Sequence, residues 1–270
     1  MGKIRIGSPD YLSVKPLIYG IVEQQEWEVK LVHAEPGELA TALEQERLDV
    51  ALIPSIEFLR GVGRHLVEGP GLVMRGRTDG IVLVTDRPVR EISRVAVAEN
   101  SRTSVAVLRI VLDKSYDALP DFCVFKADAT KWRDDYDAIL LTGDEGLRYC
   151  SGLLRAGETC YDLGEMWCDL YPSPLTAAMW VYNDDAITTK LKDLLVETRD
   201  NGVRELSLLA DGAAVGTGYD SQFVYDYLSR GWSYNIGRRE ENGLKLLEDA
   251  ALEYQLIQHR RLGKVLAEQS

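Results

Sequence analysis

The segment Ala98-Glu99-Asn100-Ser101-Arg102-Thr103-Ser104 lies between two apolar runs. Residues 95–98 predict a buried strand, whereas residues 105–112 repeat apolar side chains at helical spacing. The polar segment therefore lies where a strand turns into a helix. The first N–H groups of a helix have no intrahelical partner, so they attract anions. Three hydroxyls and the Arg102 guanidinium add donors there, which predicts a site for a carboxylate or phosphate. The alternative is that Ser101 or Thr103 only caps the helix and Arg102 is a solvated surface charge.

Strands and helices alternate before this segment. The pattern predicts a strand over 3–7, a polar turn over 8–13, a helix from Pro16 through Glu23, a strand over 27–32, a helix over 36–47 and a strand over 50–53. Such an α/β alternation implies a mostly parallel sheet whose ligands lie beyond the carboxyl ends of the strands.

A second alternating series follows a glycine-rich stretch over residues 61–80. Strands are predicted over 81–85, 95–98, near 123–126, over 138–141 and over 177–181, with mostly helices from Asp185 onward and a further strand at 232–236. We predict a two-lobed fold, with lobe 1 formed by residues 1–87 plus 184–270 and lobe 2 by residues 88–183. The C-terminal helices would pack on lobe 1, and the ligand would lie in the interlobe cleft. Three turns would meet there: 8–13, 100–104 and 142–144.

Composition limits the classes of function. The chain has 270 residues, 46% of them hydrophobic, and its net charge of −12 argues against nucleic acid or an anionic membrane as the main partner. The four cysteines, Cys123, Cys150, Cys160 and Cys168, show no paired spacing, and the three histidines are scattered, so we predict no metal site. The start of the chain shows no apolar signal region. We therefore expect a cytoplasmic protein with free thiols.

Several short motifs recur in a known family. They are Tyr11-Leu12 with Lys15-Pro16-Leu17, Asp49-Val50-Ala51 with Ile56-Glu57-Phe58-Leu59, Ser101-Arg102-Thr103-Ser104-Val105, Gly143-Asp144 with Leu147-Arg148, Asp162-Leu163-Gly164 with Trp167, and Trp180. Through them the chain resembles, nearly end to end, the chorismate dehydratases of the futalosine route to menaquinone. That resemblance implies a periplasmic-binding-protein type II fold in a cytoplasmic enzyme.

The resemblance also implies a reaction. Members of that family convert chorismate to 3-[(1-carboxyvinyl)oxy]benzoate by loss of water, with neither metal nor organic cofactor. Since the elimination makes the ring aromatic, a site that positions the substrate and stabilises departing charge can suffice. The substrate-binding positions would be Tyr11, Ser55, Gly80, Asn100, Ser101, Arg102, Thr103, Ser104, Gly143, Asp144 and Thr176.

This chain departs from the family at its pocket. Ser13 stands where the family has an Asn taken as catalytic, and Gly80 aligns with a second functional Ser, although a slip of one or two places would bring Thr78 or Asp79 there instead. Thr176 and Ala177 replace aromatic residues. A hydroxyl offers fewer hydrogen bonds than an amide, so the departures put ordinary chorismate dehydration in question.

Three hypotheses follow. In the first, a lyase acts on chorismate or a related carboxylate, with Ser13 polarising the leaving group and Asp10 or Asp79 as base, although both aspartates also fit exposed turns. In the second, a non-catalytic protein binds a small carboxylate. In the third, an enzyme in the style of the naphthoate synthase branch takes a larger substrate, but that branch's Cys-Pro-Asn-Asp signature reads Ser8-Pro9-Asp10-Tyr11 here. The C-terminal aromatic residues fit either a core or the surface of a homodimer.

Overall fold

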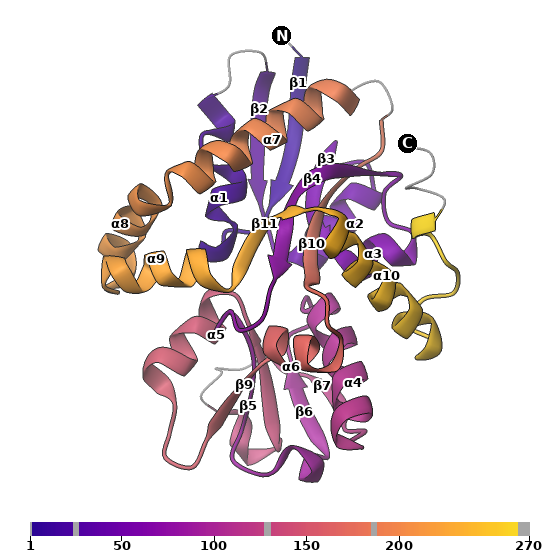
Figure 1. Ribbon diagram of the computed structural model, residues 1–270, viewed down its shortest axis with the longest axis vertical. Coiled ribbons are helices and arrows are strands. Elements are labelled where there is room, and N and C mark those ends of the chain that lie inside the picture. The colour runs from indigo at the N-terminus through magenta and orange to yellow at the C-terminus, as the bar shows by residue number, and fades with distance from the viewer. Residues whose placement is uncertain (1, 24–26, 127–130, 185–187, 264–270) are drawn as a thin grey trace.

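Two β-sheets, one above the other in Figure 1, organise the chain. The computed structural model describes residues 2–23, 27–126, 131–184 and 188–263. Helices cover both sheets, and one large apolar core cluster runs from the first sheet into the second. The start of the predicted C-terminal helical region, residues 185–187, lies outside the described residues.

The first sheet has the strand order β11-β4-β10-β3-β1-β2. Strand β1 pairs in parallel with β2 and β3, and β10 pairs antiparallel with β3 and β4. Strand β4 lies within the glycine-rich stretch for which no strand was predicted, because Gly69 and Gly71 interrupt its apolar pattern. The bounds are β1 Gly2–Ser8, β2 Trp27–His33, β3 Val50–Pro54, β4 His65–Met74, β10 Leu175–Tyr182 and β11 Trp232–Ile236.

The second sheet has the order β7-β6-β8-β5-β9. Strand β6 pairs in parallel with β7 and β8, whereas β5 runs antiparallel to β8 and β9. The bounds are β5 Ile81–Thr85, β6 Arg94–Val97, β7 Asp121–Val124, β8 Ala138–Thr142 and β9 Thr159–Asp162.

The chain crosses between the sheets at residues 75–80 and 171–174. We expected these crossings near residues 86–90 and 182–185, which put β5 with the first sheet and β10 with the second. The pairings correct both assignments, because β5 bonds to β8 and β9 while β10 bonds to β3 and β4. A buried strand has the same apolar sequence in either sheet, so its pattern does not say which partner it takes.

Helices connect the strands largely where periodicity predicts them. The predicted helix over 16–23 is an exception: it ends after one turn, and Gly20 then adopts a positive φ of 68°. The bounds are η1 Leu12–Val14, α1 Lys15–Ile18, α2 Pro36–Glu44, α3 Ser55–Arg60, α4 Arg102–Tyr116, α5 Asp144–Arg148, α6 Leu163–Leu170, α7 Thr188–Arg204, α8 Leu206–Thr217, α9 Ser221–Arg230 and α10 Arg238–Glu253.

The C-terminal helices pack on the first lobe. Helix α7 lies against α1 and β4, and α10 lies against β10 and α3. Helix α10 also contacts α4 of the second lobe, so it touches both sides of the junction. None of the described helices combines the length and apolar character needed to cross a membrane.

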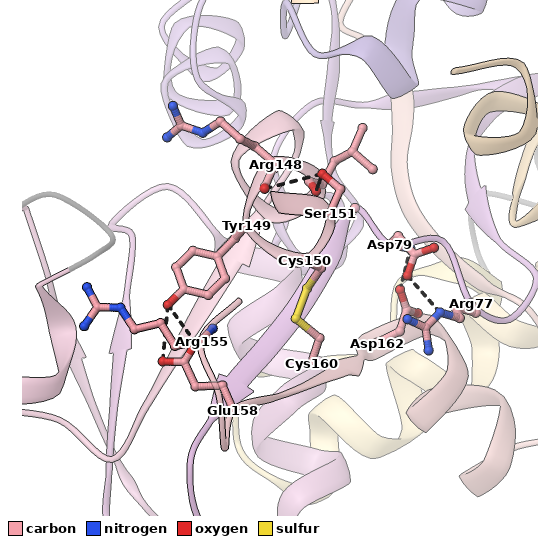
Figure 2. Close-up of a disulfide and its surroundings, with 12 residues drawn as sticks. Arg77, Asp79, Arg148, Tyr149, Cys150, Ser151, Arg155, Glu158, Cys160 and Asp162 are labelled. Atoms are coloured by element: carbon pink, nitrogen blue, oxygen red, sulfur yellow. Dashed lines mark hydrogen bonds and ion pairs between the residues drawn. A yellow bond between two sulfur atoms is a disulfide. The ribbon is translucent and has the colours of Figure 1, made fainter. Parts of the chain in front are cut away.

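Two cysteines form a disulfide in the second lobe. Cys150, just after α5, is bonded to Cys160 on the edge strand β9, as Figure 2 shows. The prediction of free thiols is therefore wrong for this pair and holds for Cys123 and Cys168. The pairing depends on a Cα–Cα distance of 6.3 Å that the ten-residue separation does not reveal.

Two helical glycines test how tightly α7 is packed. A methyl group on Gly202 of α7 would lie 2.1 Å from the Pro16 carbonyl oxygen, whereas one on Gly212 of α8 would meet no atom within 4 Å. We expect Gly202→Ala to lower the free energy of unfolding by about 1–3 kcal/mol through overpacking. The matched Gly212→Ala should raise it by roughly 0.5–1 kcal/mol through helix propensity. Urea denaturation measures both, and equal effects would contradict the packing of α7 on α1.

Candidate functional site

One pocket lies where the three predicted turns meet. Its cavity volume is about 70 Å³. The turn after β1, the start of α4 and the turn after β8 all line it, so these three turns do converge. They contribute Pro9, Tyr11, Ser13, Asn100, Ser101, Arg102, Thr103, Ser104, Thr142 and Gly143.

The remaining wall is apolar and comes mostly from the first lobe. It includes Trp232 at the start of β11, a residue that the sequence analysis assigned to scaffold or surface. Long-range strand pairing brings Trp232 opposite Met74, and no local pattern around residue 232 signals a pocket. The other apolar residues are Val14, Pro36, Leu52, Pro54, Leu72, Ile81, Ala177 and Ala178.

The start of α4 presents hydroxyls to this pocket. Ser101, Thr103 and Ser104 are each less than 10% exposed. The Ser101 hydroxyl lies 3.2 Å from that of Thr142, and among the described residues it makes no capping bond to its own helix. The Thr103 hydroxyl instead accepts a hydrogen bond from the Ile56 N–H at the start of α3, at 3.2 Å. The capping alternative is therefore wrong for both. The Arg102 N–H donates to the Asn100 carbonyl at 3.0 Å, which leaves the Thr103 and Ser104 N–H groups as the donors that an anion could use.

Arg102 joins the two lobes. Its Nη1 lies 3.0 Å from Oε2 of Glu57 on α3, whose side chain is only 7% exposed. Arg60 pairs with the same carboxylate at 2.6 Å, but from within α3 itself. Arg102 lines the pocket and is already committed to an ion pair, so it is not the solvated charge of the alternative interpretation. We infer that its main electrostatic role is to hold α4 against α3.

Tyr11 is fixed between the lobes. A methyl group on Gly143 would lie about 3 Å from several atoms of the Tyr11 ring, and Gly143 has a positive φ of 64° that favours glycine. The Tyr11 hydroxyl donates to Glu35 at 2.5 Å. Burial raises the pKa of this hydroxyl, and the Glu35 carboxylate raises it further. Tyr11 therefore supplies a protonated wall of the pocket.

Asp144 supports Ser13 without lining the pocket itself. Its Oδ1 accepts a hydrogen bond of 2.8 Å from the Leu12 N–H, next to Ser13, which is 2% exposed and does line the pocket. Burial raises the pKa of Asp144, and the Leu12 bond and Lys15 oppose that shift. This bond crosses from α5 in the second lobe to η1 in the first.

The two predicted bases do not reach the pocket. Asp10 pairs with Lys15, and its side chain is 59% exposed. Asp79 pairs with Arg77 at 2.8 Å, as Figure 2 shows. The backbone N–H groups of Thr78 and Asp79 both donate to the Asp162 carboxylate. Within the described part of the chain, no Asp, Glu, His or Lys lines the pocket.

Three other predicted residues lie beside the pocket rather than in its lining. Ser55 donates to the Thr176 carbonyl, and both residues are fully buried. Gly80 precedes Ile81, which does line the pocket. A methyl group on Gly80 would lie 2.7 Å from both the Tyr227 hydroxyl and a ring carbon of Trp232, so these two side chains fill the space of a residue-80 side chain. Over the described ranges, no three His, Cys, Asp or Glu residues cluster as metal ligands would.

Solved structures share this two-lobed arrangement. The chain resembles protein AF1704 from Archaeoglobus fulgidus with a TM-score of 0.74 and 18% identity, over 94% of this chain and 98% of that one. It resembles the periplasmic aliphatic sulphonate binding protein SsuA from Escherichia coli with a TM-score of 0.64 and 16% identity, over 96% and 89%. At such identities the likeness is one of fold, and the class is that of the periplasmic-binding-protein fold, as expected from the sequence.

The family follows from the sequence match. The model of the menaquinone biosynthesis family matches residues 4–253, so the chain belongs to this family. Chorismate dehydratase from Thermus thermophilus is 26% identical over 262 residues, which cover 91% of this chain and 94% of that protein. The family resemblance is thereby confirmed.

The two cations on Glu57 give a matched test of the interlobe ion pair. Removing Arg102 leaves Arg60 within the same helix but breaks the bridge between lobes, so Arg102→Ala should open the lobes and enlarge the radius of gyration. Arg60→Ala should not. A partly buried pair of this kind contributes about 1 kcal/mol, so carboxylate affinity should fall about fivefold in Arg102→Ala only. Small-angle scattering and calorimetry with chorismate measure this, and identical results for both variants would contradict it.

The raised pKa of Asp144 predicts a pH effect on stability. Between its unfolded and folded pKa values the folded protein holds more protons than the unfolded chain, so the contribution of Asp144 to the free energy of unfolding falls as pH rises through that window. Asp144→Asn keeps the oxygen that accepts from Leu12 and removes the charge. We therefore expect the free energy of unfolding of Asp144→Asn to rise relative to that of wild type as the pH increases above about 4. Thermal denaturation at several pH values measures it, and a constant difference would be inconsistent with a buried, charged Asp144.

Proposed function

We propose that this protein eliminates water from chorismate to give 3-[(1-carboxyvinyl)oxy]benzoate, as a chorismate dehydratase in menaquinone biosynthesis. One observation carries the proposal: within a chain of this family, Ser13 and the uncapped N-terminus of α4 line the same pocket. The 26% identity to a chorismate dehydratase over nearly the whole chain supports the same reaction.

The pocket residues fit this elimination. The Thr103 and Ser104 N–H groups at the start of α4, with the Ser101 and Ser104 hydroxyls, would hold a substrate carboxylate where the helix dipole favours negative charge. Ser13 would donate a hydrogen bond to the hydroxyl oxygen as its bond to carbon breaks. The ring loses one proton and one hydroxide, which together make water, and becomes aromatic.

The proton must leave to a group other than a pocket carboxylate, because no Asp, Glu, His or Lys from the described ranges lines the site. Its acceptor is then a water molecule or a carboxylate of the substrate itself. Catalysis would depend on orientation and on fixed donors rather than on a protein base. The contacts of Thr103 with Ile56 and of Arg102 with Glu57 would keep the cleft shut against bulk water.

A second candidate is a non-catalytic protein that binds a small carboxylate. The absence of a side-chain base from the described lining favours it, as does Ser13 in place of the family's Asn. A third is an enzyme with a larger substrate, which the small Ala177 and Ala178 side chains in the lining favour. Trp232 works against the third, because its ring occupies part of that wall.

A chorismate assay tests the function. Purified protein should convert chorismate to a product lighter by one water. Ser13→Ala should lower the rate about a hundredfold or more, since it removes the donor aimed at developing charge, and Ser13→Asn should preserve or raise it. Mass spectrometry with a no-enzyme control measures conversion against spontaneous decay.

The outcomes separate the candidates. Activity only in Ser13→Asn would indicate a diverged dehydratase. Chorismate binding without reaction in either protein would favour the binding protein. Neither binding nor reaction would mean that the pocket serves another carboxylate and would overturn the proposal.

A further inference from the structure

Two polar side chains beside the pocket lack hydrogen-bond partners. The Tyr227 hydroxyl on α9 and the Trp232 indole N–H on β11 are buried, and within the described residues neither atom reaches a partner with good hydrogen-bond geometry. Ser13 and the Trp232 indole still lie near enough to the Tyr227 hydroxyl to lower its pKa, against the larger effect of burial. The residues are 6% and 5% exposed. A buried polar atom without a hydrogen bond is unfavourable, so a ligand or water that satisfies these two atoms would stabilise the folded protein.

These two side chains converge on one point. Both approach Gly80 so closely that a methyl group there would lie 2.7 Å from the Tyr227 oxygen and from a ring carbon of Trp232. Their rings meet edge to face, with centroids 6.2 Å apart. Trp232 lines the pocket, and Ser13 of the same pocket lies close to the Tyr227 hydroxyl. Trp232 thus lines the pocket, Tyr227 lies next to it and near Ser13, and Gly80 leaves the room for the pair.

The chemistry of the pair defines its ligand. An indole N–H only donates, and burial raises the pKa of the Tyr227 hydroxyl, so this group keeps its proton at neutral pH and can donate as well. Two adjacent donors in an apolar wall suit an oxygen that bears negative charge. Figure 1 shows α9 and α4 on different sides of the junction between the sheets, so this pair and the α4 donors come from different lobes.

We propose that the Tyr227 hydroxyl and the Trp232 indole N–H bind a second carboxylate of the ligand, so that the pocket selects dicarboxylates over monocarboxylates. This deepens the proposed function and rests on it for the identity of the natural substrate, because chorismate carries two carboxylates. The pair determines specificity and takes no proton from the substrate.

Binding of inert ligands tests the proposal without turnover. Calorimetry would compare benzene-1,3-dicarboxylate with benzoate. Wild-type protein should bind the dicarboxylate more tightly. Tyr227→Phe and Trp232→Phe should each weaken dicarboxylate binding about tenfold and change benzoate binding less than twofold.

Stability of the ligand-free protein gives an independent readout. Tyr227→Phe removes an unsatisfied hydroxyl, so the melting temperature of this variant should equal or exceed that of wild-type protein. Tyr234→Phe is the matched control, because the Tyr234 hydroxyl donates to the Leu228 carbonyl at 2.9 Å. That variant should melt lower and bind both ligands as wild type does.

Three results would overturn the inference. They are equal affinity of wild-type protein for the two ligands, equal weakening of both ligands by Tyr227→Phe, or a lower melting temperature of Tyr227→Phe with unchanged dicarboxylate affinity. Loss of chorismate turnover alone would count against the proposed function and leave the dicarboxylate selectivity in place.

Discussion

The contact between the start of α3 and the start of α4 sets the geometry of the whole molecule. Thr103 of the second lobe accepts the Ile56 N–H of the first, and Arg102 pairs with the nearly buried Glu57 beside it. These bonds fix one helix N-terminus against another. Ser101, Arg102, Thr103 and Ser104 at this contact also line the pocket, so the contact that joins the lobes also forms part of the pocket wall.

Other contacts across the junction refine the pocket. Asp144 of α5 holds the Leu12 N–H and thereby positions Ser13, and Gly143 lets the Tyr11 ring lie flat against the backbone. Each is a polar or steric contact between residues more than 100 positions apart. The pocket therefore depends on how the lobes meet, and a change at the junction alters both closure and ligand binding.

The sequence predicted the fold class, the convergence of three turns and the family, because apolar periodicity and local motifs carry that information. It did not predict the strand β4, whose glycines hide its alternation, or the crossings at 75–80 and 171–174. It also placed Asp10 and Asp79 as bases, whereas ion pairs with Lys15 and Arg77 hold them outside the pocket. Long-range contacts decided each of these points.

By itself, the sequence determined most of the strands and helices, and it predicted an anion site at the turn before α4, since both follow from residue spacing and from the unpaired N–H groups at a helix start. Only the tertiary structure decided that Arg102 serves an interlobe ion pair, that Cys150 bonds to Cys160, and that Tyr227 and Trp232 fill the space at Gly80. Those relations join residues from separate elements. They depend on which side chains come close together after folding, and no local sequence pattern encodes this.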